Sequence, residues 1–161
     1  QWQRGRAGRI AGSALAIAWS FAWLIFFNFF NQYVAFYNMD TTGNIWMREP
    51  MLTGAFSEWL PIVTAALLFS MAGHILLIAV DKYALREAVQ IVLDIFGIVV
   101  ITSLLSIFPF DFSAFPEPAA AVGIEFGIRI TLGIVAFGIA ISVIVRFIKL
   151  TVNLIRGTDG R

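Results

Sequence analysis

Charged residues divide the chain into four long apolar segments. No charged residue occurs over 10–39, and charged clusters within 40–58, 81–87 and 111–117 separate the later apolar runs. About 20 residues of α-helix cross a hydrocarbon core of about 30 Å, so each run is long enough to span a membrane. Because lipid offers the backbone no hydrogen bonds, helices are the expected form of such runs. We predict transmembrane spans at about 10–37, 58–81, 85–108 and 118–156.

The composition also indicates an integral membrane protein. Of the 161 residues, 60% are hydrophobic and 13% are charged, whereas soluble domains average about 45–50% apolar and about 25% charged. The net charge of +1 gives no reason to expect nucleic acid as a partner. We therefore expect one all-α domain over 1–161, a polytopic membrane protein with four transmembrane helices in an antiparallel bundle.

The distribution of Lys and Arg predicts the orientation of the chain. With the N-terminus inside, nine basic residues face the cytoplasm and two, Arg48 and Arg129, face the other side. Cytoplasmic loops carry an excess of Lys and Arg, so both termini are expected in the cytoplasm, in a prokaryotic plasma membrane. Trp46 and Trp59 fit an aromatic belt at the outer interface. The nine inner residues are Arg4, Arg6, Arg9, Lys82, Arg86, Arg146, Lys149, Arg156 and Arg161.

The two connections on the outer side differ in kind. The first, within 38–59, is long and mixed, and its apolar residues suggest that it lies on the membrane or on a partner. The second, FPFDFSAFPEP over 108–118, alternates Phe with Pro and small polar residues. Each proline fixes its own φ and disfavours the helical region for the preceding residue, which predicts an extended, stiff connection.

The fourth span is longer than a membrane requires and contains an acid and a base four residues apart. A single helix over 118–156 would measure about 58 Å. Glu125 and Arg129 would share one face of it. In one interpretation Arg129 marks the outer interface and Glu125 is its partner one turn further out, a weak contact. In the other, both charges lie at membrane depth and face a water-filled cavity.

Glycines suggest that the fourth span packs closely against another helix. Small residues allow helix backbones to approach each other in lipid. The spacing supports helix packing within the chain or between chains, although glycine is common in membrane helices. The glycines are Gly123 and Gly127, which form a G-x-x-x-G, and Gly133 and Gly138.

A second pair of ionisable residues is expected near the cytoplasmic side. His74 lies seven residues before Asp81 and Asp94 lies seven residues after Glu87, which predicts similar depths in two adjoining spans. A His–Asp pair can relay protons, because histidine titrates near neutral pH. The alternative is a structural contact that fixes helix packing. The candidate partners of Asp94 are His74, Gln90, Arg146 and Lys149.

The first span carries an amide face and an aromatic face. Asn28 and Asn31 are expected to bond neighbouring helices or to line a polar vestibule at the depth of Glu125 and Arg129. The aromatic residues recur at helical spacing and are expected to face lipid or a partner helix, with a bound quinone, carotenoid or lipid as the alternative. This stripe consists of Trp19, Trp23, Phe26, Phe30, Tyr33 and Tyr37.

Enzymatic function is not expected from this sequence. The chain has no cysteine and one histidine, and no nucleophile, phosphate-binding or metalloprotease motif occurs in it. No metal site and no cofactor are therefore expected. The favoured hypothesis is a non-catalytic structural or accessory subunit of a larger membrane complex, with lipid and other subunits as partners. The alternative is a small homo-oligomeric ion or proton channel that uses His74, Asp94, Glu125, Arg129, Asn28 and Asn31.

Overall fold

Four long helices make up most of the protein. A computed structural model describes residues 2–39, 43, 45–80, 82–113, 115 and 117–155. All four helices are long and apolar enough to cross a membrane, as the sequence predicted. Of the charged residues used above, Asp40, Asp81, Arg156 and Arg161 lie outside the described residues. The helices are α1 (Trp2–Ile25), α2 (Phe56–Ala79), α3 (Tyr83–Ile107) and α4 (Pro118–Ile155).

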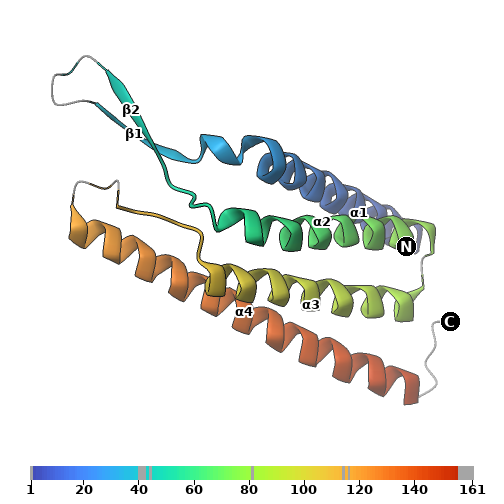
Figure 1. Ribbon diagram of the computed structural model, residues 1–161. Helices are drawn as coiled ribbons and strands as arrows, with labels where there is room; N and C mark the ends of the chain where they lie inside the picture. The colour runs from blue at the N-terminus through green and yellow to red at the C-terminus, as the bar shows by residue number, and fades with distance from the viewer. Residues whose placement is uncertain are drawn as a thin grey trace.

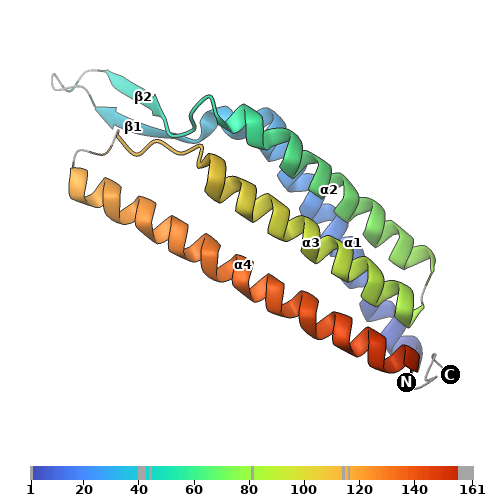
Figure 2. The same ribbon diagram turned by 60° about the horizontal axis from the view of Figure 1, so that its bottom comes forward.

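Each helix packs beside the next one along the chain. Figure 1 shows α1 against α2, α2 against α3 and α3 against α4, with the chain reversing direction at each connection. The start of α1 and the end of α4 lie at the same end of the molecule in both ribbon views (Figures 1 and 2). We call this the turn end, because the short 80–82 connection lies there, and we call the opposite end the hairpin end.

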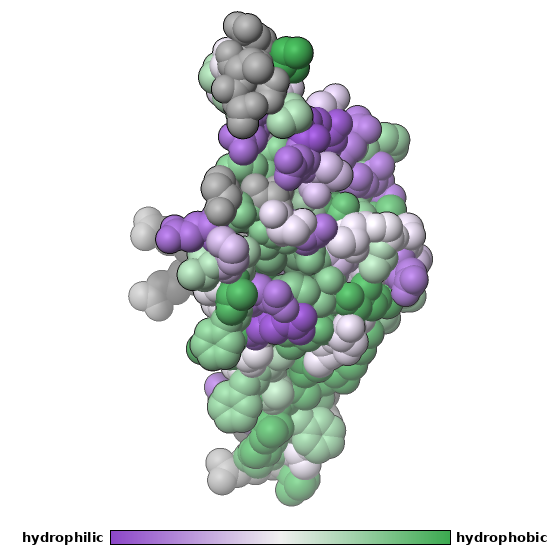
Figure 3. Space-filling view, turned by 60° about the vertical axis from the view of Figure 1, so that its left-hand side comes forward, coloured by the Kyte–Doolittle hydropathy of each residue, from purple (hydrophilic) through white to green (hydrophobic). Residues whose placement is uncertain are grey.

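Apolar side chains cover much of the outer surface. None of the residues in the most apolar stretches of α3 and α4 is fully buried within the chain. Figure 3 shows a face of the molecule whose lower part is mostly hydrophobic, with hydrophilic residues gathered in separate patches. This distribution is typical of helices whose outer faces contact lipid or other membrane subunits.

The first span ends earlier than predicted. Helical structure stops at Tyr33 instead of residue 37, and it begins at Trp2, before the predicted start at residue 10. Its last turns are irregular: a π-helix covers Phe26–Phe30 and a 3-10 helix covers Asn31–Tyr33. Val34 then leaves the helical region, with φ −76° and ψ 88°. The following aromatic residues favour an extended strand, and their backbone groups pair with a second strand instead of continuing the helix.

A β-hairpin, which the sequence did not predict, projects from the first span. Strand β1 (Ala35–Met39) pairs antiparallel with β2 (Trp46–Pro50). The register places Phe36 opposite Glu49, Tyr37 opposite Arg48 and Met39 opposite Trp46. The first outer connection is therefore an ordered hairpin over these two strands.

The second connection lies against the base of the hairpin. Met51 N–H donates to the Val34 carbonyl at 3.1 Å, which extends the hairpin by one step. Segment 51–53 also pairs with the second connection: Thr53 N–H donates to the Pro109 carbonyl and Asp111 N–H to the Met51 carbonyl, both at 2.9 Å. These bonds flank an antiparallel bridge between Leu52 and Phe110. The predicted extended conformation of this connection is confirmed over 109–111.

The hydrophobic core lies where the π-helix of the first span, α2 and α3 meet near the hairpin end. Phe56, Trp59 and Val63 of α2 are buried there. The Trp59 indole N–H donates to the Val100 carbonyl of α3 at 3.1 Å, so the ring joins two helices. Trp59 is only 4% exposed, which means that it packs inside the protein instead of lying in an interfacial belt. The partly buried side chains around it are Phe27, Leu52, Leu60, Leu67, Val100, Leu104 and Ile107.

We expect Trp59 to be the most sensitive tryptophan of the chain. Trp59→Ala should lower the free energy of unfolding by about 3–5 kcal/mol, because it opens a cavity in the core. Trp59→Phe should lower it by about 1 kcal/mol through loss of the indole hydrogen bond. Unfolding of purified protein in mixed micelles of rising SDS fraction measures both effects. Trp19→Ala is the matched control, since Trp19 is 64% exposed, and an equal loss there would contradict this core.

Candidate functional site

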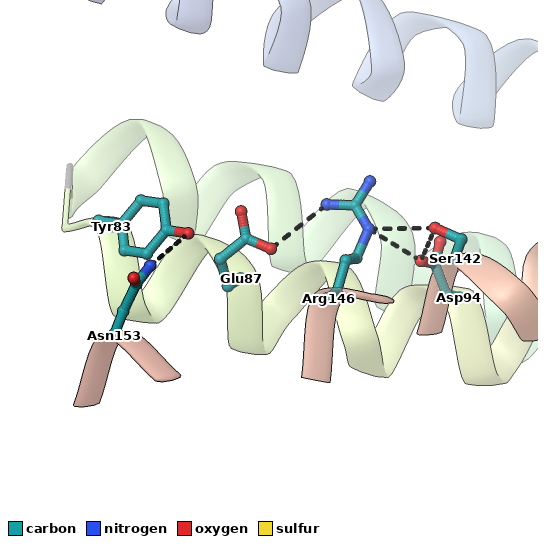
Figure 4. A network of polar contacts seen from close by, with 6 residues as sticks. All are labelled: Tyr83, Glu87, Asp94, Ser142, Arg146 and Asn153. Atoms are coloured by element: carbon teal, nitrogen blue, oxygen red, sulfur yellow. Dashed lines mark hydrogen bonds and ion pairs between the residues drawn. The ribbon is translucent and has the colours of Figure 1, made fainter. Parts of the chain in front are cut away.

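A ladder of polar contacts joins α3 to α4 near the turn end (Figure 4). Arg146 of α4 lies between two carboxylates of α3: its Nε is 3.2 Å from Asp94 Oδ2, and its Nη1 is 3.6 Å from Glu87 Oε2. Ser142 Oγ donates to Asp94 Oδ2 at 3.2 Å and accepts from Arg146 Nε at 3.2 Å. We call this set the polar ladder, and it comprises Tyr83, Glu87, Asp94, Ser142, Arg146 and Asn153.

Matched spacing in the two helices produces the polar ladder. Its members on α3 are separated by four and then seven residues, and so are its members on α4. Residues that are four or seven positions apart lie on the same face of a helix. Because the two chain directions are opposed, Asn153 Nδ2 meets the Tyr83 hydroxyl at 3.0 Å at one end and Ser142 meets Asp94 at the other. Arg146 was among the predicted partners of Asp94, and the same spacing could have added Glu87 and Ser142.

The structure does not bring His74 and Asp94 together. Asp94 lies 11 residues into α3 and His74 lies five residues before the end of α2. Their depths from the turn end are therefore about 16 Å and about 8 Å, instead of the similar depths expected. Asp94 turns to α4, whereas His74 Nδ1 is buried without a hydrogen-bond partner among the described residues. A His–Asp proton relay has no geometric support in this chain.

Glu125 and Arg129 form the predicted ion pair one turn apart. Arg129 Nη2 is 2.9 Å and Arg129 Nε is 3.0 Å from Glu125 Oε1. Both side chains are nearly half exposed, at 45% for Glu125 and 43% for Arg129. The guanidinium carbon also lies 3.7 Å from the ring centroid of Phe108, the residue that ends α3. The pair therefore lies at the level of the hairpin end of α3. This position favours the interpretation in which Arg129 marks the outer interface over the one in which both charges face a water-filled cavity.

Asn28 and Asn31 satisfy backbone groups at the irregular end of the first span. Asn28 Nδ2 donates to the Leu24 carbonyl at 2.9 Å and to Thr64 Oγ1 of α2 at 3.2 Å. Asn31 Nδ2 donates to the Phe27 carbonyl. A π-helix leaves carbonyls without their usual partners, and side-chain amides can replace those donors. The amides therefore stabilise the local backbone and one helix contact.

The remaining polar contact between α1 and α2 was missed from the sequence. Ser20 Oγ and Ser70 Oγ are 3.1 Å apart, and Ser20 is buried. Serines are common in membrane helices, so nothing in the sequence distinguished this pair. The predicted aromatic stripe of the first span is confirmed in part: Trp19, Trp23, Phe30 and Tyr33 are exposed, whereas Phe26 is half-buried against Trp23 and Phe27, and Tyr37 lies in β1 instead of the span. This exposure fits contact with lipid or a partner helix.

The four glycines singled out on α4 do not touch the neighbouring helices. A β-carbon added at Gly123, Gly127, Gly133 or Gly138 would meet nothing within 4 Å. The close approaches occur elsewhere: a β-carbon at Gly73 would lie 3.0 Å from Val89 Cγ1, and one at Gly97 would lie 3.7 Å from Ile139 Cδ1. Glycine therefore allows the close approach of α2 and α3 at Gly73, whereas a β-carbon at Gly97 would make only an ordinary contact with α4. The packing of the α4 glycines between chains stays a prediction.

A shallow apolar groove of about 300 Å³ lies between α2 and α3. Its lining carries no titratable group, so it offers no site for acid–base chemistry. Within the described parts of the chain, no three His, Cys, Asp or Glu residues are grouped so that they could hold a metal ion. The groove is lined by Phe69, Ala72, Gly73, Leu76, Ala88, Val89, Val92 and Leu93.

Together these features indicate a multi-pass membrane protein in which polar side chains bond backbone carbonyls or other side chains of the same chain. No protein-family model matches the chain, and neither curated proteins nor solved structures include a similar protein. The assignment of a function therefore depends on the geometry of the chain itself.

Removal of Arg146 should destabilise the contact between α3 and α4. In Arg146→Met, Glu87 and Asp94 lose their shared cation, and we expect a loss of about 2–4 kcal/mol in the free energy of unfolding. Adding Asp94→Asn to this variant should restore part of the lost free energy of unfolding, because one carboxylate without a cation partner is removed. Arg129→Met is the control and should lose at most about 1 kcal/mol, since its pair is exposed. Equal losses in the two arginine variants would contradict the structural role of the polar ladder.

Gly73 and Gly127 provide a second test, because a neighbouring helix lies close to the first and not to the second. Gly73→Ile should separate α2 from α3 and lower the thermal midpoint by several degrees, because the new side chain meets Val89. Gly127→Ile, on the open face of α4, should leave the midpoint of the isolated chain nearly unchanged. Thermal unfolding of both purified variants in detergent measures the difference. A larger effect at Gly127 than at Gly73 would contradict the observed packing.

Proposed function

We propose that this chain is a non-catalytic structural or accessory subunit of a larger membrane protein complex. Its four helices cross the bilayer as an antiparallel bundle. The hairpin end lies outside, and the turn end with both termini lies in the cytoplasm. The chain supplies apolar helix faces and an outer hairpin to the assembly, and the chemistry of the complex belongs to other subunits.

The polar ladder is the observation that carries this proposal. Arg146, Glu87, Asp94 and Ser142 bond one another between two neighbouring helices of the same chain. An ion or proton pathway needs ionisable groups that face a shared aqueous cavity. Groups that are mutually bonded at a helix contact instead fix the relative position of the helices. The ladder therefore supports a packing role.

The positions of the charges support the proposed orientation. From Glu87 to Ile107 the α3 helix rises about 30 Å, and from Arg129 to Arg146 the α4 helix rises about 26 Å. Both lengths match a hydrocarbon core of about 30 Å. The positive-inside rule places the more basic end in the cytoplasm. The described basic residues at the turn end are Arg6, Arg9, Lys82, Arg86, Arg146 and Lys149, and those at the hairpin end are Arg48 and Arg129.

A channel, the second hypothesis from the sequence, has less support. Its polar groups are distributed over separate places: Asn28 bonds α2, Glu125 pairs with Arg129, and Asp94 pairs with Arg146. A pore built from this chain would require several copies arranged around polar faces, whereas the exposed faces are apolar.

The mass and composition of the native assembly test the proposal. We expect the tagged chain, gently solubilised from its own membrane, to purify at fixed stoichiometry with at least one different membrane subunit. The purified chain alone, reconstituted in liposomes, should give ion and proton flux at the background of empty liposomes. The proposal fails if the assembly contains only copies of the 17.8 kDa chain. A conductance of that assembly that Asp94→Asn abolishes would then favour the channel.

A further inference from the structure

We infer that the turn end of the contact between α3 and α4 binds the phosphate headgroup of an anionic phospholipid from the inner leaflet. Tyr83, the first residue of α3, and Lys149, near the end of α4, hold the headgroup, and we call these two residues the headgroup site. The inference rests on the proposed orientation, which places the turn end in the cytoplasm, and it is independent of the accessory role.

Helical spacing places Lys149 on the face of α4 that meets α3. Two contacts define this face: Arg146 pairs with Asp94 of α3. Asn153 Nδ2 donates to the Tyr83 hydroxyl oxygen at 3.0 Å. Lys149 lies three residues after Arg146 and four before Asn153, and residues at these spacings share a helix face. It is exposed and forms no ion pair within the part of the chain that the structure describes.

The Tyr83 hydroxyl supplies a second hydrogen-bond donor at the same end. Its oxygen accepts the bond from Asn153, and among the described residues none accepts a bond from its own O–H group. Tyr83 is 45% exposed. A phosphate oxygen accepts hydrogen bonds from both a phenol and an ammonium group, and the bond from the ammonium group is the stronger one. Each of the two helices therefore supplies one donor for a phosphate, within about 6 Å along the helix axis.

The headgroup site lies at the depth of the lipid headgroups. In the proposed orientation the inner boundary of the hydrocarbon core passes near Glu87 and Arg146. Tyr83 lies four residues before Glu87, and Lys149 lies three residues after Arg146. These spacings place the two residues about 6 Å and about 5 Å outside the boundary. The headgroup layer is about 5–7 Å thick on each side of the hydrocarbon core, so both side chains lie within it.

The charge of the turn end favours an anionic phospholipid over a zwitterionic one. Six described basic residues lie at this end against two described carboxylates, and both carboxylates bond Arg146. Lys and Arg beside the membrane attract the anionic lipids of the cytoplasmic leaflet, and basic sites between transmembrane helices bind phospholipid headgroups. The basic residues are Arg6, Arg9, Lys82, Arg86, Arg146 and Lys149, and the carboxylates are Glu87 and Asp94.

An exposed apolar ridge of α4 continues from the headgroup site into the hydrocarbon core. Val145 and Ile141 precede Lys149 by four and eight residues, and residues at this spacing form one ridge along a helix. Val145 is 43% and Ile141 is 47% exposed. A phospholipid whose phosphate contacts Lys149 can therefore place an acyl chain along these two side chains. This ridge is the reason to expect a phospholipid instead of free phosphate as the ligand.

Lipid binding to the purified full-length chain tests the headgroup site. Native mass spectrometry in detergent would compare phosphatidylglycerol with phosphatidylcholine of the same acyl chains. We expect one bound phosphatidylglycerol per chain, with an affinity about tenfold above that for phosphatidylcholine. Lys149→Gln should lower the affinity for phosphatidylglycerol about fivefold, as expected for the loss of one basic residue at a membrane surface. Lys149→Arg should retain the affinity, because the cation remains.

A matched control removes the same two groups from the hairpin end. Tyr37 lies opposite Arg48 in the hairpin and is 50% exposed. The Tyr37→Phe/Arg48→Gln variant changes the net charge by the same amount as Tyr83→Phe/Lys149→Gln, and it should keep the wild-type preference for phosphatidylglycerol. An equal loss of preference in the two double variants would indicate a general effect of net charge and would overturn the inference. The single Lys149→Gln variant keeps every bond of the polar ladder, so its result does not depend on a change in folding.

Inorganic phosphate as a competitor distinguishes the two sources of a phosphate group. Bound phosphatidylglycerol should remain in excess inorganic phosphate, because the acyl chain contributes to binding. Its displacement would indicate a site for free phosphate and would overturn the assignment to lipid. Equal affinity of the wild-type chain for both phospholipids, or unchanged affinity in Lys149→Gln, would also overturn the inference. The accessory role is tested by the subunit composition of the native assembly, so either conclusion can fail while the other stands.

Discussion

Arg146 lies between two carboxylates of α3, and the contact between α3 and α4 depends on that position. Where a charge is partly shielded from water, it is stable only when neighbouring groups replace the water it has lost. Arg146 supplies a cation partner to both Glu87 and Asp94, and these two carboxylates balance its own charge. Ser142 is a further hydrogen-bond partner. The charges that resemble a functional centre in the sequence therefore align α3 with α4, together with the hydrogen bond from Asn153 to Tyr83.

The same requirement explains the other polar side chains near the membrane-spanning helices. Asn28 and Asn31 bond carbonyls of the first span near its irregular end. The Trp59 indole reaches a carbonyl of α3 from within the core. At the hairpin end, the second connection supplies backbone partners to 51–53. Each of these groups bonds a neighbouring segment of the same chain and so stabilises the fold.

The row of helices leaves the chain with much uncovered surface. α3 and α4 bury none of their most apolar residues completely, and the first span exposes its aromatic stripe. Lipid accounts for such surfaces within the bilayer, because hydrocarbon chains solvate them well. On the hairpin, Trp46 is 66% and Met39 48% exposed as well. The strands project past the ends of α2 and α3, whereas α4 reaches as far as they do (Figure 1).

The sequence by itself determined the number of spans, because an unbroken apolar run of sufficient length has no other stable form in lipid. It also determined the Glu125–Arg129 pair, whose spacing of four residues is enough to bring both ends together on one helix. Only the tertiary structure decided which partner Asp94 takes, since that depends on where α3 begins and on the register of α3 against α4. The hairpin was likewise decided by long-range pairing: Ala35–Met39 becomes a strand because β2 supplies its backbone partners. Local patterns specify helices and contacts within one turn, whereas partners far apart in the chain depend on registers that no single segment contains.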